Sequence, residues 1–308
     1  MSKIQVAKVN TLAAHQDCVY ALAPGSQPHV FFSSGGDGVV AQWDLTNLEQ
    51  AKMVAKVPNS VYALCYYSQR NALIVGQNFD GIHIIDLTEK KEKGSIKLGN
   101  AAIFDIKVMN DHIFCALGNG EVHVLDIATL QTLRVIKASD KSARCIAISP
   151  KNNELAVGFS DNYIRIYNLQ TFSKKKEFEA HKISVFTVQY SPDERYLISG
   201  SRDAHLKIWE VNQSYELKQA IVAHMYAINH LVFSADGKHF VTCSMDKSIK
   251  VWDAATYQLL KVIDKARHAG HGTSVNKVLW SNFNNLLVSA SDDRSISVWS
   301  INFNLSEE

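Results

Sequence analysis

A histidine, a serine or threonine, an aspartate and a tryptophan occur together four times along this chain, with the same spacing each time. The four sets are His15, Ser33, Asp37 and Trp43; His181, Ser199, Asp203 and Trp209; His224, Thr242, Asp246 and Trp252; and His271, Ser289, Asp293 and Trp299. Serine, histidine and aspartate are the residues with which hydrolases activate a serine nucleophile. A single active site has no use for four copies, so the repetition favours a structural role over catalysis.

Each aspartate and tryptophan of these sets bounds a seven-residue phrase that recurs along the whole chain. Clear copies are DGVVAQW (37–43), DNYIRIY (161–167), DAHLKIW (203–209), DKSIKVW (246–252) and DRSISVW (293–299), and weaker copies are FDGIHII (79–85) and NGEVHVL (119–125). Their closing positions follow one another at spacings of 42, 40, 42, 42, 43 and 47 residues. A period of this length is typical of a four-stranded propeller blade. Seven such units account for all 308 residues and leave no segment for a second domain. We therefore expect a single all-β domain over residues 1–308.

Within a unit, apolar and polar residues alternate in short runs that predict strands, and no segment has a helical period. The fifth unit, for example, predicts strands over residues 185–191, 196–201, 205–211 and 214–222. The last unit stops near Ile301 without a fourth strand, whereas residues 4–12 read as a strand with no unit of its own. We therefore expect residues 4–12 to complete the last blade, because closure removes an exposed sheet edge.

The recurring dipeptides resemble those of the WD40 repeat family. They are Ala14-His15, Ala180-His181, Ala223-His224 and Gly270-His271, and Trp43-Asp44, Trp209-Glu210, Trp252-Asp253 and Trp299-Ser300. The resemblance implies a seven-bladed β-propeller with four antiparallel strands per blade. It also implies that each histidine, hydroxyl, aspartate and tryptophan set forms a buried hydrogen-bonded network. Blades two to four depart from the pattern, because they lack the histidine and replace the tryptophan with Ile85, Leu125 and Tyr167.

Composition points to a soluble protein of the cell interior. The 32 basic and 30 acidic residues nearly balance, which argues against a broad nucleic-acid or membrane surface. The five cysteines form no CxxC pair, and the first twenty residues lack a secretory signal, so we expect a reducing, cytoplasmic location. Gly35-Gly36 precedes a strand rather than a helix, and His268 and His271 have no partners for a metal, so no cofactor or metal is expected.

One repeated position carries the residues that vary most in chemistry. It follows the apolar residue that opens each innermost strand, and in blade order it holds Tyr20, Tyr62, Phe104, Arg144, Phe186, Asn229 and Asn276. These side chains should ring the mouth of the central channel, and Arg202, just before a turn aspartate, should lie on the same face. Aromatic residues and arginine dominate interaction hot spots. The aromatic residues fit equally well as packing between blades, whereas an arginine buried without a carboxylate is unfavourable, so Arg144 and Arg202 should reach solvent or a ligand.

The sequence favours a protein-interaction scaffold over an enzyme. We expect it to hold a peptide or partner loop over the channel mouth, as a monomer within a larger complex. An acidic or phosphorylated segment with an apolar anchor suits the two arginines. One alternative is a reader of methylated lysine, in which the aromatic residues form a cage with Asp292 nearby. The other is an enzyme within the channel, for which the sequence shows no converging carboxylate, histidine or metal set outside the four repeated ones.

Overall fold

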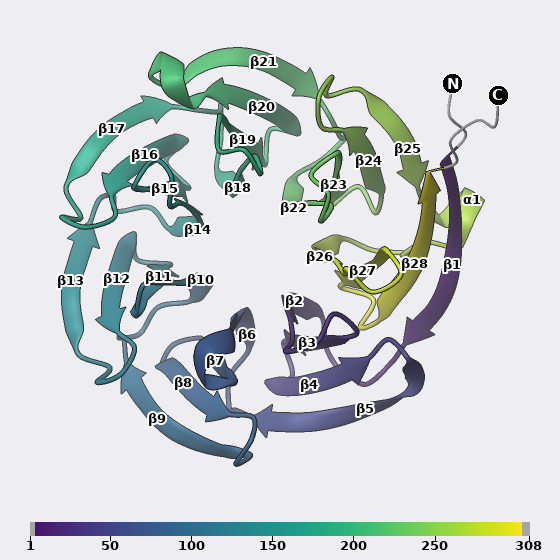
Figure 1. The fold of residues 1–308 in the computed structure, drawn as a ribbon, viewed down its shortest axis with the longest axis horizontal. Coiled ribbons are helices and arrows are strands. Elements are labelled where there is room, and N and C mark those ends of the chain that lie inside the picture. Colours follow the sequence, from purple (N-terminus) through teal and green to yellow (C-terminus); the bar gives the residue numbers. More distant parts are fainter. Residues whose placement is uncertain (1–3, 304–308) are drawn as a thin grey trace.

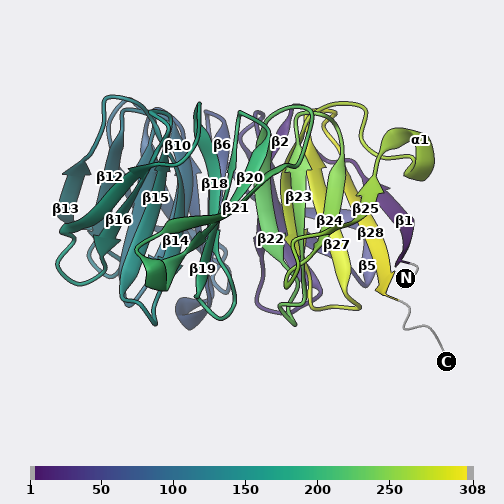
Figure 2. The ribbon, with the colours of Figure 1, turned by 90° about the horizontal axis from the view of Figure 1, so that it is seen from above.

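Seven four-stranded antiparallel sheets stand around a central axis like the blades of a propeller (Figure 1). The computed structural model describes residues 4–303. Seen from the side, the blades have similar heights and form a flat drum (Figure 2). The expected seven-bladed architecture is therefore confirmed.

The chain runs outward through each blade from the axis to the rim. The innermost strands are β2 (Val19–Pro24), β6 (Val61–Tyr67), β10 (Ile103–Met109), β14 (Ala143–Ser149), β18 (Val185–Tyr190), β22 (Ile228–Phe233) and β26 (Val275–Trp280). The second strands are β3 (Val30–Gly35), β7 (Ala72–Gln77), β11 (His112–Leu117), β15 (Glu154–Phe159), β19 (Tyr196–Ser201), β23 (His239–Ser244) and β27 (Leu286–Ser291). The third strands are β4 (Val39–Asp44), β8 (Gly81–Asp86), β12 (Glu121–Asp126), β16 (Tyr163–Asn168), β20 (His205–Glu210), β24 (Ile249–Asp253) and β28 (Ile296–Phe303). The outer strands are β5 (Asn47–Lys56), β9 (Lys91–Lys97), β13 (Thr132–Lys137), β17 (Lys174–Glu179), β21 (Glu216–Val222), β25 (Leu259–Ile263) and β1 (Ile4–Leu12).

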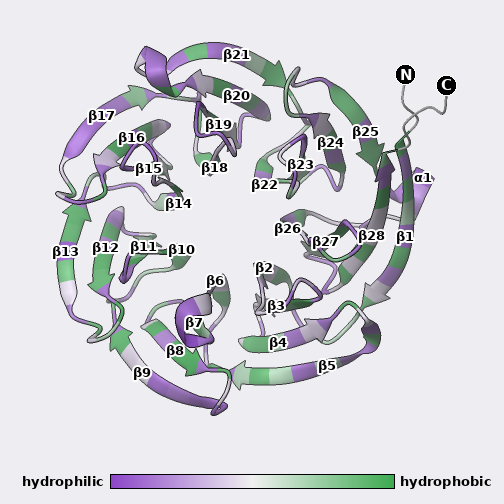
Figure 3. Ribbon diagram, in the orientation of Figure 1, coloured by the Kyte–Doolittle hydropathy of each residue, from purple (hydrophilic) through white to green (hydrophobic). Residues whose placement is uncertain are grey.

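The hydrophobic core lies between neighbouring blades. One cluster joins Ile74 of β7 to Ile103 and Ile113 in the next blade, and all three side chains are buried. The second strands are buried on both faces because each packs between two neighbouring blades, whereas the outer strands mix polar and apolar residues (Figure 3). The apolar runs of the sequence therefore mark the strands that lie between two neighbours.

The last blade takes its outer strand from the other end of the chain. Strand β1 pairs antiparallel with β28, with Ile4 opposite Phe303 and Leu12 opposite Ile296. The expected closure by residues 4–12 is thus confirmed. Strand β28 continues past the expected end at Ile301, because β1 supplies hydrogen-bonding partners up to Phe303.

The few helical segments of the described residues lie in the connections between strands. The 47-residue interval that ends at Trp299 contains the four-residue helix α1 (Lys265–His268), although the sequence shows no helical period. Asp264 caps this helix by accepting a hydrogen bond from the backbone N–H of Arg267 at 2.9 Å. Short 3-10 turns occupy Ser68–Arg70 and Val211–Gln213. The second of these delays the outer strand of blade five, which begins at Glu216 rather than Ser214.

Candidate functional site

The mouth of the central channel is lined by all seven residues at the repeated position. Tyr20, Tyr62, Phe104, Arg144, Phe186, Asn229 and Asn276 border one cavity of about 350 Å³. That volume falls within the range of about 300–1,000 Å³ seen for ligand pockets. The placement of these residues around the channel therefore matches the expectation, while their role in binding a partner stays a prediction.

Five of the seven residues stack on one another across blades one to five, and we call them the rim belt (Tyr20, Tyr62, Phe104, Arg144 and Phe186). Tyr20 meets Tyr62 edge-on with ring centres 4.7 Å apart, and Tyr62 stacks on Phe104 at 5.9 Å. The guanidinium of Arg144 lies 3.9 Å from the ring centre of Phe104 and 4.6 Å from that of Phe186. The aromatic residues therefore pack between blades and still face the channel, which leaves their binding role a prediction.

Arg144 is fixed between two rings yet keeps its charge unpaired. Burial lowers the pKa of its guanidinium from the usual value. Among residues 4–303, no carboxylate lies within ion-pair distance of Arg144, and its N–H groups donate to no protein atom. Stacking between aromatic faces stabilises a cation and leaves the edge of the guanidinium plane free to donate hydrogen bonds. The group is therefore presented to whatever enters the channel.

The two asparagines complete the ring by joining neighbouring blades. Asn229 donates from Nδ2 to the carbonyl of Val275 at 2.8 Å, and Asn276 donates to the carbonyl of Val19 at 3.0 Å. Asn276 also donates to Oδ1 of Asp292 at 2.7 Å. These amides are thus engaged in contacts between blades six, seven and one, and they offer less to a ligand than the rim belt does.

Arg202 lies on the same end of the propeller but outside the channel. Its backbone N–H donates to the carbonyl of Ser184 at 3.0 Å, and its side chain is exposed. It does not line the cavity that Arg144 lines. The two arginines that the sequence singled out are therefore separate points on one face rather than one cluster.

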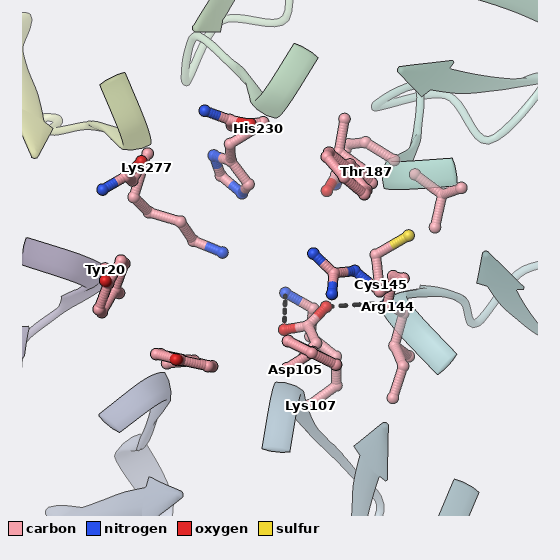
Figure 4. A pocket seen from close by; sticks show the side chains of 16 residues that line it. Tyr20, Asp105, Lys107, Arg144, Cys145, Thr187, His230 and Lys277 are labelled. Carbon is pink, nitrogen blue, oxygen red and sulfur yellow. Dashed lines mark hydrogen bonds and ion pairs between the residues drawn. The ribbon is translucent and has the colours of Figure 1, made fainter. Parts of the chain in front are cut away.

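Four charged or titratable side chains that sequence analysis did not select also face the channel. They are Asp105, Lys107, His230 and Lys277 (Figure 4). Two of them are lysines, and among the described residues no three His, Cys, Asp or Glu side chains gather there as a metal site would require. Three of them follow directly after a rim position, where strict alternation would turn the side chain into the core.

A β-bulge at the start of every innermost strand explains why alternation fails. In β10 the pairing register shifts between Ile103 and Asp105, and in β26 it shifts between Val275 and Lys277. At a bulge two residues oppose one on the partner strand, so consecutive side chains emerge on the same side. Phe104 and Asp105 therefore both line the channel, and Lys107 follows two residues later on the same face.

Electrostatics in the channel are dominated by positive charge. Nζ of Lys107 lies 3.6 Å from Oδ1 of Asp105, and this carboxylate raises the pKa of Lys107. The other oxygen of Asp105 accepts a hydrogen bond from the backbone N–H of Ile146 at 2.8 Å. Burial, helped by Lys107 and opposed by Asp105, lowers the pKa of Lys277. Burial and the two lysines also lower the pKa of His230 well below 6.5, which keeps that imidazole neutral.

The four repeated sets form the buried networks that the WD40 resemblance implied. In blade five, His181 lies 3.1 Å from Asp203 through Nδ1 and 2.7 Å from the Ser199 hydroxyl through Nε2. Trp209 donates from Nε1 to that hydroxyl at 2.9 Å. Blades one, six and seven repeat the same contacts around Ser33, Thr242 and Ser289.

Family comparisons agree with this geometry. A model of the WD domain, G-beta repeat, matches residues 7–44, and a model described as "Nucleolar protein 10-like, N-terminal domain" matches residues 42–302. The chain belongs to the nucleolar protein 10-like family. Its propeller is built of WD40 repeats, as the recurring dipeptides indicated.

Individual relatives of this nucleolar protein 10-like chain are distant. Protein groucho of Drosophila melanogaster is 25% identical over 217 residues, covering 67% of this chain and 29% of groucho. THO complex subunit 3 of Arabidopsis thaliana is 24% identical over 216 residues, covering 69% of this chain and 68% of the subunit. The crystal structure of the WD40 propeller domain of Doa1 superposes with a TM-score of 0.84 at 17% identity, covering 97% of each chain. The chain thus spans less than a third of groucho, and the likeness to Doa1 concerns the fold.

Blades two to four of this nucleolar protein 10-like propeller use other contacts in place of the histidine network. In blade four, Arg165 pairs with Asp161 at 2.8 Å and with Glu177 at 3.2 Å, and its guanidinium lies over Phe159. In blade four an arginine therefore takes the place of the histidine as partner of the turn aspartate, a contact that sequence analysis did not predict. In blade two, Asn78 donates to the Ser60 hydroxyl at 2.9 Å.

Within residues 4–303, the structure contains no helix with the length and hydrophobicity needed to cross a membrane.

Proposed function

We propose that this propeller is a protein-interaction scaffold that holds an acidic or phosphorylated segment of a partner over the channel mouth. The observation that carries this proposal is the Arg144 guanidinium, which is held between Phe104 and Phe186 without a carboxylate partner among residues 4–303. Arginine pairs with carboxylate or phosphate through two parallel hydrogen bonds. A cation that is already positioned loses little conformational entropy when it binds such a group.

Exposed apolar side chains next to the mouth supply a place for the apolar anchor. Met225 and Tyr226 precede β22 and are 81% and 60% exposed, and Met245, in the turn after β23, is 58% exposed. The backbone N–H of Met245 donates to the carbonyl of Ala227, so the loop and the turn lie together. Exposed methionine and tyrosine side chains adapt readily to a partner surface. The footprint would therefore extend from the rim belt toward blades five and six, past Arg202.

The methyl-lysine alternative fits the geometry less well. Arg144 already covers one face of Phe104 and one face of Phe186, and Tyr20 and Tyr62 contact each other. The carboxylate of Asp292, which a cage would need, accepts a hydrogen bond from Asn276. Catalysis in the channel is also less well supported, because Asp105 accepts two backbone hydrogen bonds and pairs with Lys107. His230 is neutral, but burial and the two lysines lower its pKa well below 6.5, which makes it a weak base.

The names of the relatives support membership of a complex, since one of them is a THO complex subunit. The cytoplasmic location expected from the sequence stays a prediction. The description of the matching family names a nucleolar protein and favours the nucleus instead.

A charge-reversed variant tests the docking surface. We expect Arg144→Glu with Arg202→Glu to lose partners in an affinity capture from source cells, because loss of a hot spot costs about 2 kcal/mol, or about thirtyfold in affinity. Arg134→Glu, on the exposed outer strand β13, is the matched control and should keep them. Capture of every partner by the double variant, at an unchanged melting temperature, would overturn the assigned surface.

A further inference from the structure

The channel and its rim belt carry more positive charge than the one carboxylate of the lining balances. Arg144, Lys107 and Lys277 come from blades four, three and seven, and Asp105 is the one acidic residue in the lining. Figure 4 shows Lys277 reaching toward the axis from one side and Arg144 from the other, with Lys107 beside Asp105. Two positive charges therefore remain after Asp105 is counted, and no described protein group neutralises them.

These charges are held where water screens them poorly. The Lys107 side chain is 37% exposed, and its exposed part faces the cavity. Among residues 4–303, neither Lys277 nor Arg144 has a carboxylate within ion-pair distance. Unpaired charges removed from bulk water are destabilising unless a ligand or solvent compensates them. The arrangement costs the folded protein stability that a bound anion would restore.

We infer that the channel contains a binding site for a tetrahedral oxyanion, with a phosphoryl group held by Arg144 of the rim belt together with Lys107 and Lys277 of the channel wall. A phosphoryl group carries close to two negative charges at neutral pH, which matches the excess in the channel. A carboxylate carries one and would leave a positive charge uncompensated. The inference rests on the proposed function and deepens it, because Arg144 belongs to both sites. It adds Lys107 and Lys277, which have no part in the docking surface.

Phosphate and pyrophosphate are the probes for this site, titrated into the whole chain by calorimetry at constant ionic strength. We expect saturable binding by the unaltered protein and a loss of about tenfold or more in Lys277→Gln, the amount that one charge-assisted hydrogen bond contributes. Lys182→Gln removes an exposed lysine from the same end of the propeller and should bind as the unaltered protein does. Absence of saturable binding at millimolar concentrations, or equal affinity in the two variants, would overturn the inference.

A variant that should bind more tightly excludes misfolding as the cause of weaker binding. Asp105→Asn removes the one negative charge of the lining and frees Lys107, so it should bind pyrophosphate severalfold more tightly. A damaged fold would weaken binding instead, and weaker or unchanged binding in a variant with normal melting would contradict the site. If Lys277→Gln loses pyrophosphate but still captures protein partners, the anion site and the docking surface are separate.

Two sources of the phosphoryl group are separated by competition. Capped phosphoserine that displaces pyrophosphate shows that a phosphorylated side chain reaches the three cations. If only inorganic phosphate and pyrophosphate compete, the site takes free anions that pass the rim belt.

Discussion

In each complete network the hydrogen bonds run in one direction, because each residue donates to the next one. Aspartate can only accept, so the Asp203 contact requires a proton on Nδ1 of His181. Indole can only donate, so Trp209 occupies an acceptor position of Ser199, whose own proton is then free to reach Nε2. The order tryptophan, serine, histidine, aspartate thus satisfies a neutral imidazole at both nitrogens. It also explains why the four residues recur together and why losing one favours losing the rest.

Titration properties agree with this chain of bonds. Burial lowers the pKa of His181, against the opposing effect of Asp203. Burial acts to raise the pKa of Asp203, but hydrogen bonds from His181 and from the backbone N–H groups of Lys182 and His205 outweigh it, so the pKa lies well below its usual range. The pair is therefore a neutral imidazole beside an ionised carboxylate at neutral pH.

Asp203→Ala should destabilise the protein sharply, because it leaves the buried imidazole N–H and two backbone donors without an acceptor. Each buried donor left without an acceptor costs about 1–3 kcal/mol of the free energy of unfolding. Asp193→Ala, in an exposed pair with Arg195, should cost about 0–1 kcal/mol. Urea denaturation of both variants measures the difference. Equal midpoints would show that the network does not stabilise the fold.

At the scale of elements, the repeat made the strands of each blade predictable from the sequence. The bulge in each innermost strand hid some of the side chains that line the channel. Period and alternation were enough to place the strands and the seven rim positions. They were not enough to find Asp105, His230 and Lys277, because each lies on the bulge where alternation fails. The sequence signal is present all the same, since a polar residue follows the rim position in these three blades. The stacking of Arg144 between Phe104 and Phe186 could not be predicted, because it depends on the distances between blades.

The outer strand of blade seven offers a test of closure at this scale. Removing residues 1–12 uncovers the hydrogen-bonding edge of β28 and the apolar side chains that Ile4 and Leu12 cover. We expect a lower melting temperature and self-association that grows with concentration, since an open strand edge pairs with other chains. Removing residues 304–308 is the control for shortening the chain. Light scattering that shows a stable monomer after the first deletion would argue against β1 as a required closing strand.

Across the whole molecule, the polar contacts are unevenly distributed around the ring. Blades one, five, six and seven have complete networks, and blade four replaces the histidine with Arg165. Blades two and three depend more on apolar packing, as in the cluster around Ile74 and Ile103. Tyr62 and Phe104 belong to blades two and three, so part of the candidate docking surface stands on blades without a histidine network.

Hydrogen exchange should reveal this unevenness. We expect amides of β8 and β12 to exchange faster than those of β20 and β24, because fewer buried hydrogen bonds oppose local opening. A difference of about 1.4 kcal/mol in opening free energy gives tenfold faster exchange. Mass spectrometry of peptides from these four strands measures it. Uniform protection around the ring would mean that apolar packing holds the blades as firmly as the networks do.

The pairing of β1 with β28 also determines when the ring of blades can close during synthesis. On the ribosome, Ile4 is made long before Phe303, the residue it faces across the sheet. Six blades can assemble from neighbouring stretches of chain as they emerge, but the seventh must wait for the last strand. Until then, β1 has no partner and the nascent ring is open at both ends. Strand β1 therefore waits, with its hydrogen-bonding groups unpaired, while the strands of the other six blades are synthesised.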